Sequence, residues 1–300
     1  MNQLLLGIDL GGTKIEGALL DVSHGFQIVK RLRVPTEADQ GYAHILNQIQ
    51  KVIQLLTEDH PISFNHIGIG TPGIIDKTTQ LIKNCNTLGM MSRPMKKDLE
   101  AMLGCEVRMA NDANCFAVAE SLYGAVPDYV KDAEVVFGII MGTGVGSGIV
   151  VNGKVIHGKH GIGGEWGHNI LDETGDLCYC GKKGCVETFI SGPACQKYFE
   201  KISGRKLPMA EIYSLYLNQD AHARETIDRL LHYYGKAMAN IINIIDPDIV
   251  VLGGGLGNLD VLYEKGPEEV KKYVFNYELN TLFVKPKLGD SAGVVGAALL

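Results

Sequence analysis

A group of cysteines in the middle of the chain has the composition of a metal site. Cys178, Cys180 and Cys185 lie close together, and His168 stands a short loop upstream of them. Three thiolates and one imidazole fill the tetrahedral shell of zinc and leave no position open, which is typical of a structural ion. Such binding contributes on the order of 10 kcal/mol to the ordering of a loop. Three reduced cysteines in a loop are the alternative.

A carboxylate stands at a second place where chemistry is expected. Asn111-Asp112 follows a predicted strand at 106–110 and precedes a predicted helix, and active-site residues often lie at such boundaries. There the Asp112 carboxylate could accept the proton of an attacking hydroxyl group. Asp and Asn are also common helix N-caps. From these residues alone, catalysis by Asp112 and capping by Asp112 both remain open.

Two glycine-rich turns could hold phosphate groups. In Asp9-Leu10-Gly11-Gly12-Thr13-Lys14 and in Gly142-Thr143-Gly144, glycines remove Cβ atoms where backbone N–H groups could point at an anion. Asp9 could hold hydrated Mg²⁺, and Thr13 or Lys14 could meet a phosphate. Neither turn has the spacing of a P-loop or of a dinucleotide-binding fingerprint. Two ordinary hairpin turns are the alternative.

The strands around these turns form the same pattern twice. Strands predicted at 4–9 and 15–20 flank the first turn as a β-hairpin, and strands at 135–141 and 148–151 flank the second turn. A glycine turn that joins two strands differs from the strand-turn-helix setting of dinucleotide-binding folds. The repeated pattern therefore implies two similar α/β halves.

Helices complete the two halves. Apolar residues recur at helical spacing at 39–57 and again near 221–245, so we predict an amphipathic helix in each segment. The predicted domains are 1–112 together with a C-terminal helix at 290–300, and 113–289, which carries the zinc loop. No stretch rich in Pro, Ser or charge marks the boundary near residue 112.

The composition excludes several classes of protein. The 300 residues include 28 basic and 34 acidic side chains, for a formal net charge of −6, and no basic stripe suited to nucleic acid is visible. No segment reaches the roughly 18 unbroken apolar residues of a membrane helix, and MNQLLLGID lacks the basic start of a signal peptide. Seven cysteines without an export signal favour metal over disulfides and predict the reducing cytoplasm.

Three motifs together resemble the actin-like ATPase superfamily of sugar kinases, Hsp70 and actin. They are the segment 7–14, the turn at 142–148 and Gly253-Gly254-Gly255. A narrower resemblance, over nearly the whole chain, is to the ROK family of bacterial sugar kinases. Its most specific elements are Gly164-Glu165-Trp166-Gly167-His168 and the cysteine-containing run 178–187. The implied fold is a pair of ribonuclease-H-like (actin-like ATPase) α/β domains with a cleft between them.

The resemblance implies a role for each matching residue. Asp112 matches the family's catalytic base, and one ring nitrogen of His168 would bind zinc while the other faces the sugar. The residues implied to bind the sugar are Gly73, Asn86, Asn111, Asp112, Glu165, His168 and Glu187. The residues implied to bind ATP and Mg²⁺ are Asp9, Gly11, Gly12, Thr13, Lys14, Gly142, Thr143, Gly144, Gly253, Gly254 and Gly255.

The activity implied by the resemblance is ATP-dependent phosphorylation of a hexose at its terminal hydroxyl. The runs 165–169 and 188–192 resemble the fructokinase/mannokinase branch, so fructose or mannose is the expected acceptor. Kinases for glucose, N-acetylglucosamine or N-acetylmannosamine are the alternative, because the family's sugar contacts are nearly shared.

Two readings from other classes are disfavoured. A sugar-responsive ROK repressor would need a helix-turn-helix domain ahead of the first strand. We expect none, because the first strand is predicted to start within the first few residues, which leaves no room for such a domain. An actin-like or Hsp70-like ATPase would have no sugar for Glu165, His168 and Glu187 to orient. The resemblance also implies a homodimer.

Overall fold

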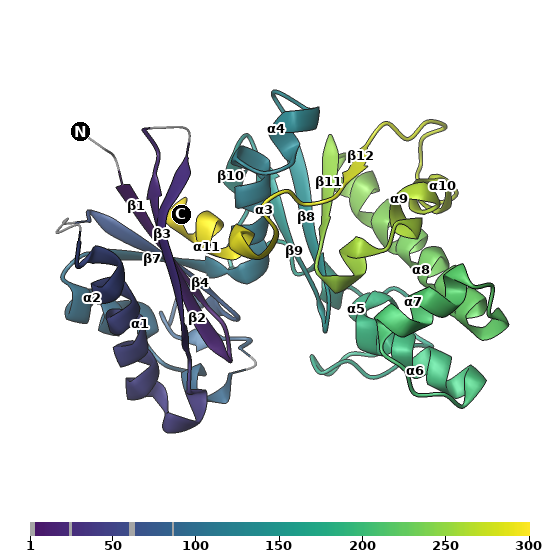
Figure 1. The fold of residues 1–300 in the computed structure, drawn as a ribbon. Coiled ribbons are helices and arrows are strands. Elements are labelled where there is room, and N and C mark those ends of the chain that lie inside the picture. Colours follow the sequence, from purple (N-terminus) through teal and green to yellow (C-terminus); the bar gives the residue numbers. More distant parts are fainter. Residues whose placement is uncertain (1–3, 24–25, 60–63, 86) are drawn as a thin grey trace. The chain divides into compact units, whose positions relative to one another are not determined.

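The computed structural model describes the chain except for residues 1–3, 24–25, 60–63 and 86. It divides into two compact units, each formed from more than one segment. Unit 1 comprises Met1–Gly124, Lys154–Gly163 and Leu288–Leu300, and unit 2 comprises Ala125–Gly153 and Gly164–Lys287. Both units combine a twisted sheet with helices (Figure 1).

The sheet of unit 1 begins with the predicted hairpin and continues with parallel strands. Its strand order is β3-β2-β1-β4-β7. The pairs β1–β2 and β2–β3 are antiparallel, whereas β1–β4 and β4–β7 are parallel. The carboxyl ends of β1, β4 and β7 therefore share one edge of the sheet. The strands are β1 (Leu4–Leu10), β2 (Lys14–Asp21), β3 (Gln27–Pro35), β4 (His66–Thr71) and β7 (Glu106–Asn111).

Helices and short strands complete unit 1. The apolar stripe predicted for the first helix is confirmed, since Ile45, Ile49, Val52, Ile53 and Leu56 are all buried. Their burial fixes the face that this helix turns to the sheet. The helices are α1 (Tyr42–Thr57), α2 (Met95–Leu103), α3 (Asp112–Leu122) and α11 (Ala292–Ala298), and the short strands are β5 (Ile74–Ile75), β6 (Ile82–Lys83) and β10 (Lys154–Val155).

The boundary between the units differs from the predicted division at residue 112. Helix α3 belongs to unit 1, because it packs against the C-terminal helix α11. The packing is so close that a Cβ on Gly296 would overlap the carbonyl of Cys115. The segment Lys154–Gly163 also joins unit 1, so the chain passes to unit 2 after Gly124 and returns twice.

Unit 2 repeats the arrangement of a hairpin followed by parallel strands. Its strands run in the order β9-β8-β11-β12, with β8–β9 antiparallel and β11 parallel to both β8 and β12. The strands are β8 (Val135–Met141), β9 (Val145–Val151), β11 (Ile249–Gly253) and β12 (Leu282–Val284). The helices are α4 (Val126–Tyr129), α5 (Glu187–Ile190), α6 (Gly192–Ser203), α7 (Met209–Leu217), α8 (Ala221–Ile245), α9 (Val261–Glu264) and α10 (Gly266–Lys271).

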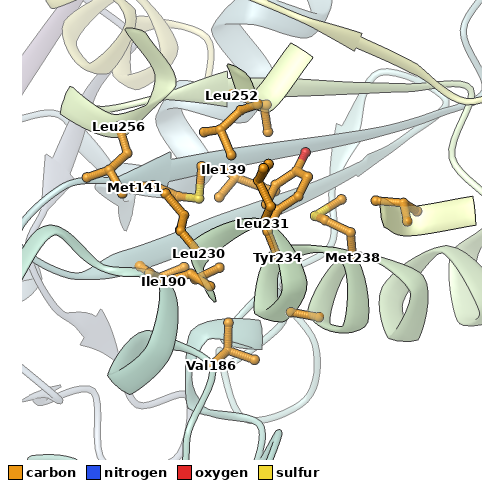
Figure 2. Close-up of a cluster of buried hydrophobic side chains, with 14 of the residues drawn as sticks. Ile139, Met141, Val186, Ile190, Leu230, Leu231, Tyr234, Met238, Leu252 and Leu256 are labelled. Atoms are coloured by element: carbon orange, nitrogen blue, oxygen red, sulfur yellow. The ribbon is translucent and has the colours of Figure 1, made fainter. Parts of the chain in front are cut away.

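The core of unit 2 joins its longest helix to the sheet and to the loop that holds the cysteines. Figure 2 shows side chains of α8, including Tyr234 and Met238, beside Ile139 of β8. Val186 and Ile190 enter the same cluster from α5 and its start. Glu187, which lies between them in sequence, is thereby anchored at the base of the cysteine loop.

Within the described residues, no helix is long and apolar enough to cross a membrane.

Candidate active site and metal cluster

The junction between β7 and α3 shows which residue caps the helix. Asn111 is the N-cap of α3, because its Oδ1 accepts the N–H of Asn114 at 2.7 Å. The Asp112 Oδ1 accepts the neighbouring N–H of Ala113 at 2.8 Å. Its side chain keeps an exposed surface. The capping requirement of the helix is therefore met without the Asp112 carboxylate, which stays available for chemistry.

The electrostatics of this edge of unit 1 favour protonated carboxyl groups. Desolvation by the surrounding protein atoms raises the pKa of Asp112, although the backbone N–H of Ala113 opposes the shift. Desolvation also raises the pKa of Asp9 to about 6, and the charges of Asp112 and Glu16 add to that shift. A general base works best with a pKa near the operating pH. Raised carboxyl pKa values at one edge are typical of an active site.

Replacing Asp9 by asparagine tests this electrostatic arrangement. The folded-state pKa of about 6 exceeds the ordinary value of 3.8, so the stability that this group contributes is complete below pH 4 and is lost as the pH rises through 6. Asp9→Asn is therefore expected to raise the free energy of unfolding by about 1–3 kcal/mol at pH 8, without Mg²⁺ or nucleotide. The difference should shrink towards pH 4 in urea unfolding experiments. An equal difference at both pH values, or a similar gain from the exposed Asp39→Asn control, would contradict it.

The first glycine turn is held by hydrogen bonds on its inner side. The N–H of Gly11 donates to the carbonyl of Lys14 at 2.9 Å, and the buried Thr36 donates its Oγ1 proton to the carbonyl of Gly11 at 2.7 Å. Gly12, Thr13 and Lys14 are exposed. Hydrogen bonds hold the backbone of this turn in place while its tip is exposed to solvent, so a ligand could bind there at a low cost in ordering the chain.

Of the two residues implied to contact the sugar from the segment after β4, Gly73 is described by the structure and Asn86 is not. Gly73 lies against Cys85, where an added Cβ would come within 2.7 Å of the Cys85 Cβ. Its carbonyl accepts the hydroxyl proton of Thr71 at 2.8 Å. The glycine at 73 is therefore required by packing, whatever else it contacts. Asn86 lies outside the described residues.

The second glycine turn is braced by Glu187. The N–H of Gly142 donates to the carbonyl of Gly144 at 2.9 Å, and the N–H of Val145, directly after the turn, donates to the Glu187 Oε2 at 3.0 Å. The family resemblance implies only a sugar-binding role for Glu187, and it did not reveal this hydrogen bond. The two residues stand 42 positions apart, so no local spacing signals their contact.

Gly144→Ala tests the bracing of the turn. A Cβ at Gly144 would come within 2.5 Å of the Glu187 Oε2, and the flexible carboxylate is expected to move away from the N–H of Val145. Loss of one charge-assisted hydrogen bond corresponds to about 1.5–3 kcal/mol, so kcat/KM should fall roughly 10- to 100-fold in steady-state assays with little change in Tm. In Gly142→Ala the added Cβ meets no atom within 4 Å, and a smaller loss is expected. Equal losses in the two variants would contradict the bracing role.

The four residues predicted to bind a metal lie close together in the structure. One ligand atom from each of His168, Cys178, Cys180 and Cys185 lies within 4.8 Å of the others. The Cys178 sulfur is 3.5 Å from the His168 Nδ1, and the Cys180 and Cys185 sulfurs are 3.5 Å apart. Four soft and borderline donors at these separations fit a tetrahedral zinc ion.

The surroundings of the cluster fix the histidine ring. The His168 Nε2 lies 2.9 Å from the Tyr179 hydroxyl oxygen, so the nitrogen turned away from the sulfurs has a partner. The resemblance implied that this nitrogen would face the sugar. Hydrogen bonds of this kind orient metal-binding imidazoles. The sequence analysis missed Tyr179, although its place between two ligand cysteines could have suggested it.

The cluster and the second turn share Glu187. The Cys178 sulfur lies 3.9 Å from the Glu187 Oε1, while the Oε2 of the same carboxylate accepts from Val145. Glu165 precedes the turn of Trp166, whose buried indole donates from Nε1 to the carbonyl of Ala237 at 3.2 Å. Packing of Trp166 therefore holds the peptide next to Glu165 against α8.

The third glycine motif follows β11. Gly254 has φ of +78°, and an added Cβ would overlap the carbonyl of Met141, so only glycine fits there. Gly255 begins a short helical turn, Gly255–Asn258, and a Cβ on it would meet no atom within 4 Å. Open space beside a glycine-rich turn would allow a flat ring to approach the backbone.

The structure thus groups the expected site residues within each unit. Among the described residues, unit 1 contains Asp9, the first glycine turn, Gly73, Asn111 and Asp112, whereas unit 2 contains the others. Those in unit 2 are Gly142, Thr143, Gly144, Glu165, His168, Cys178, Cys180, Cys185, Glu187, Gly253, Gly254 and Gly255.

Known proteins are similar to this chain over nearly its whole length. A profile of the ROK family matches residues 5–300. The N-acetyl-D-glucosamine kinase of Vibrio atlanticus (strain LGP32) is 36% identical over 98% of this chain and 98% of its own length.

Two solved structures share the fold over their whole length. The ROK hexokinase from Thermus thermophilus has a TM-score of 0.88 and 31% identity over 99% of this chain and 97% of that chain. The ROK family glucokinase from Streptomyces griseus, in complex with glucose and AMPPNP, has a TM-score of 0.78 and 25% identity over 99% and 98%. These likenesses confirm the predicted α/β fold of the actin-like ATPase kind. The chain belongs to the ROK family.

Proposed function

We propose that this protein is an ATP-dependent kinase that phosphorylates N-acetyl-D-glucosamine at its terminal hydroxyl. The observation that carries the proposal is the 36% identity to an N-acetyl-D-glucosamine kinase over 98% of both chains. The fructokinase branch favoured by the sequence analysis has no support from that relative, whose name matches the stated alternative.

Asp112 is the proposed general base. Its carboxylate leaves the capping of α3 to Asn111, and the raised pKa makes it a better proton acceptor than an ordinary aspartate. Phosphoryl transfer to a hydroxyl needs such a group to orient the attacking oxygen and take its proton. Asn111 and Gly73 would contact the sugar from the same unit.

The glycine motifs are the proposed ATP-binding elements. Backbone N–H groups of the turns at 11–14 and 142–144 would meet phosphate oxygens, and Gly253, Gly254 and Gly255 would lie against the adenosine. Asp9 would hold hydrated Mg²⁺, which supplies charge neutralisation of the phosphates when it is bound. A cation at Asp9 would favour its ionised form and oppose the raised pKa seen in the protein alone.

A structural zinc ion is the proposed occupant of the cysteine cluster. His168, Cys178, Cys180 and Cys185 would hold it, and the ion would supply folding free energy but no step of the reaction. Through the Glu187 carboxylate, the same loop would fix the second phosphate turn. Glu165 and Glu187 would orient the sugar hydroxyls from unit 2.

Coupled measurement of ADP release against a panel of sugars tests the acceptor. We expect the highest kcat/KM for N-acetylglucosamine, with fructose, mannose, glucose and N-acetylmannosamine at least about tenfold lower, since buried polar groups discriminate strongly against a sugar that leaves them unpaired. A higher kcat/KM for fructose would restore the fructokinase assignment and overturn this one.

A further inference from the structure

Four charged side chains share one face of the sheet of unit 1. Asp9 of β1 lies directly opposite Glu16 of β2, and Glu16 lies directly opposite Arg33 of β3. Directly opposed residues of antiparallel strands point to the same face of a sheet, and so do residues two apart on one strand. Arg31 therefore belongs to this face as well. Of the four, the proposed function uses only Asp9.

The Asp9 carboxylate lies in a cradle lined by two glycines. A Cβ on Gly293 of α11 would come within 2.6 Å of the Asp9 Oδ2, and a Cβ on Gly70 would come within 3.5 Å of the Asp9 Oδ1. The two glycines thus keep side-chain atoms away from both oxygens of the carboxylate. Mg²⁺ prefers carboxylate oxygens as protein ligands, so these residues fit the Mg²⁺ proposed for Asp9.

Glu16 is a buried carboxylate held in one position. It is 2% exposed, and it accepts hydrogen bonds from the Nε of Arg31 at its Oε1 and from the Nε of Arg33 at its Oε2. A buried charge is stable only when it is paired. Because each oxygen has a partner on β3, the Glu16 carboxylate is restrained from turning towards Asp9.

The charge of Glu16 acts on Asp9 more strongly than that of Arg33. Neighbouring strands stand about 4.8 Å apart, and Arg33 lies one strand farther from β1 than Glu16 does. The Arg33 side chain is also 39% exposed, against 3% for that of Glu16, and solvent weakens its field. Desolvation first, and then the charges of Asp112 and Glu16, raise the pKa of Asp9, whereas Arg33 lowers it by less.

We propose that Glu16 is a positioning residue for the Mg²⁺ of the reaction, which supplies a fixed negative charge beside Asp9 and strengthens the attraction of this place for a divalent cation. Arg31 and Arg33 keep the Glu16 carboxylate from turning onto the ion, so Asp9 is the carboxylate that faces it. The inference rests on the proposed function in one respect, the placing of Mg²⁺ at Asp9.

Calorimetric titration of the full chain with a non-hydrolysable ATP analogue tests this role. The quantity compared is the Mg²⁺ enhancement, which is the association constant with saturating Mg²⁺ divided by the constant without added Mg²⁺. Repulsion between Glu16 and the phosphates cancels in this ratio, and no chelator is used, so zinc is not removed. We expect the enhancement to fall about tenfold in Glu16→Gln and to rise about threefold in Arg33→Met, since charges of opposite sign are lost at increasing distance from the ion.

Lys30→Met is the matched control for Arg33→Met. Lys30 lies on β3 opposite Leu19, whose side chain packs in the core beneath α1, and its Nζ donates to the Asp59 Oδ2 at 2.8 Å. The substitution removes a positive charge from the other face of the same strand, so the Mg²⁺ enhancement should equal that of wild type. Equal changes in Lys30→Met and Arg33→Met would contradict the role of the face that carries Glu16.

The signs of the changes separate a positioning role from a structural one. A weakened fold would lower the affinity for the analogue by the same factor with and without Mg²⁺ and would leave the enhancement unchanged. An unchanged enhancement in Glu16→Gln, or shifts in the same direction in Glu16→Gln and Arg33→Met, would overturn the inference. If Glu16→Gln does not fold, Arg33→Met decides alone, because its enhancement must rise.

Kinetics distinguish this inference from the proposed function. Glu16→Gln should need about tenfold more Mg²⁺ for half-maximal ADP release but should reach a kcat near that of wild type at saturating Mg²⁺. A kcat that stays low at saturating Mg²⁺ would contradict a role confined to the ion. Absence of Mg²⁺ enhancement in wild type would overturn this inference, whereas absence of sugar-dependent ADP release would overturn the proposed kinase and leave the titration valid.

Discussion

Replacing Asp112 with asparagine is expected to lower kcat by about 10²–10⁴-fold while the KM for the sugar stays close to wild type. The amide keeps the size of the side chain and its acceptor oxygen for the N–H of Ala113, but it cannot take up the proton of the attacking hydroxyl. Because Asn111 carries the capping of α3, the helix should remain intact. Steady-state ADP release and far-UV circular dichroism measure the two effects.

The control for Asp112→Asn is a charge loss elsewhere in the same unit. Asp39→Asn removes one negative charge from an exposed position of unit 1, and its kcat should equal that of wild type. A wild-type rate in Asp112→Asn would remove this residue from the chemistry. A lower Tm together with lost sugar binding would instead assign Asp112 a structural role.

Removing one cysteine of the cluster should have the largest effect on stability. We expect about one zinc ion per chain by elemental analysis, little or none in Cys178→Ser, and a Tm lower by about 5–15 °C. Activity should fall with the metal content, since Cys178 lies next to the Glu187 carboxylate that braces the second turn. A strong chelator should produce the same changes in wild type.

Cys105→Ser is the control that separates the effect of losing a metal ligand from the general effect of losing a thiol. Cys105 is partly buried in unit 1, outside the cluster, and its substitution should leave the zinc content unchanged and alter stability by about 1 kcal/mol or less. A wild type that purifies without zinc and has the same Tm with and without added zinc would contradict the structural ion.

Local patterns were sufficient to predict the elements that present the site. The hairpins around both glycine turns and the apolar face of α1 follow from residue spacing, which reflects contacts within one element. The cysteine cluster was also predictable, because three of its four ligands lie within one short loop. Which residue caps α3 needed the structure, since it depends on which of two adjacent side chains meets the N–H of Asn114.

Contacts between distant segments could not be predicted from such patterns. Helix α3 belongs to unit 1 because Cys115 meets Gly296, a contact that no local spacing records. The bond between Glu187 and Val145 is of the same kind. The acceptor sugar was also out of reach, because the resemblance implies nearly the same sugar contacts for kinases of different hexoses.

Phosphorus NMR of the products from Mg-ATP and N-acetylglucosamine is the most direct test of the central claim, phosphoryl transfer to a sugar. We predict one phosphomonoester of N-acetylglucosamine for each ADP formed, with no growth of the inorganic phosphate signal. ADP accompanied only by inorganic phosphate, at a rate independent of the sugar, would contradict a sugar kinase and indicate an ATPase instead.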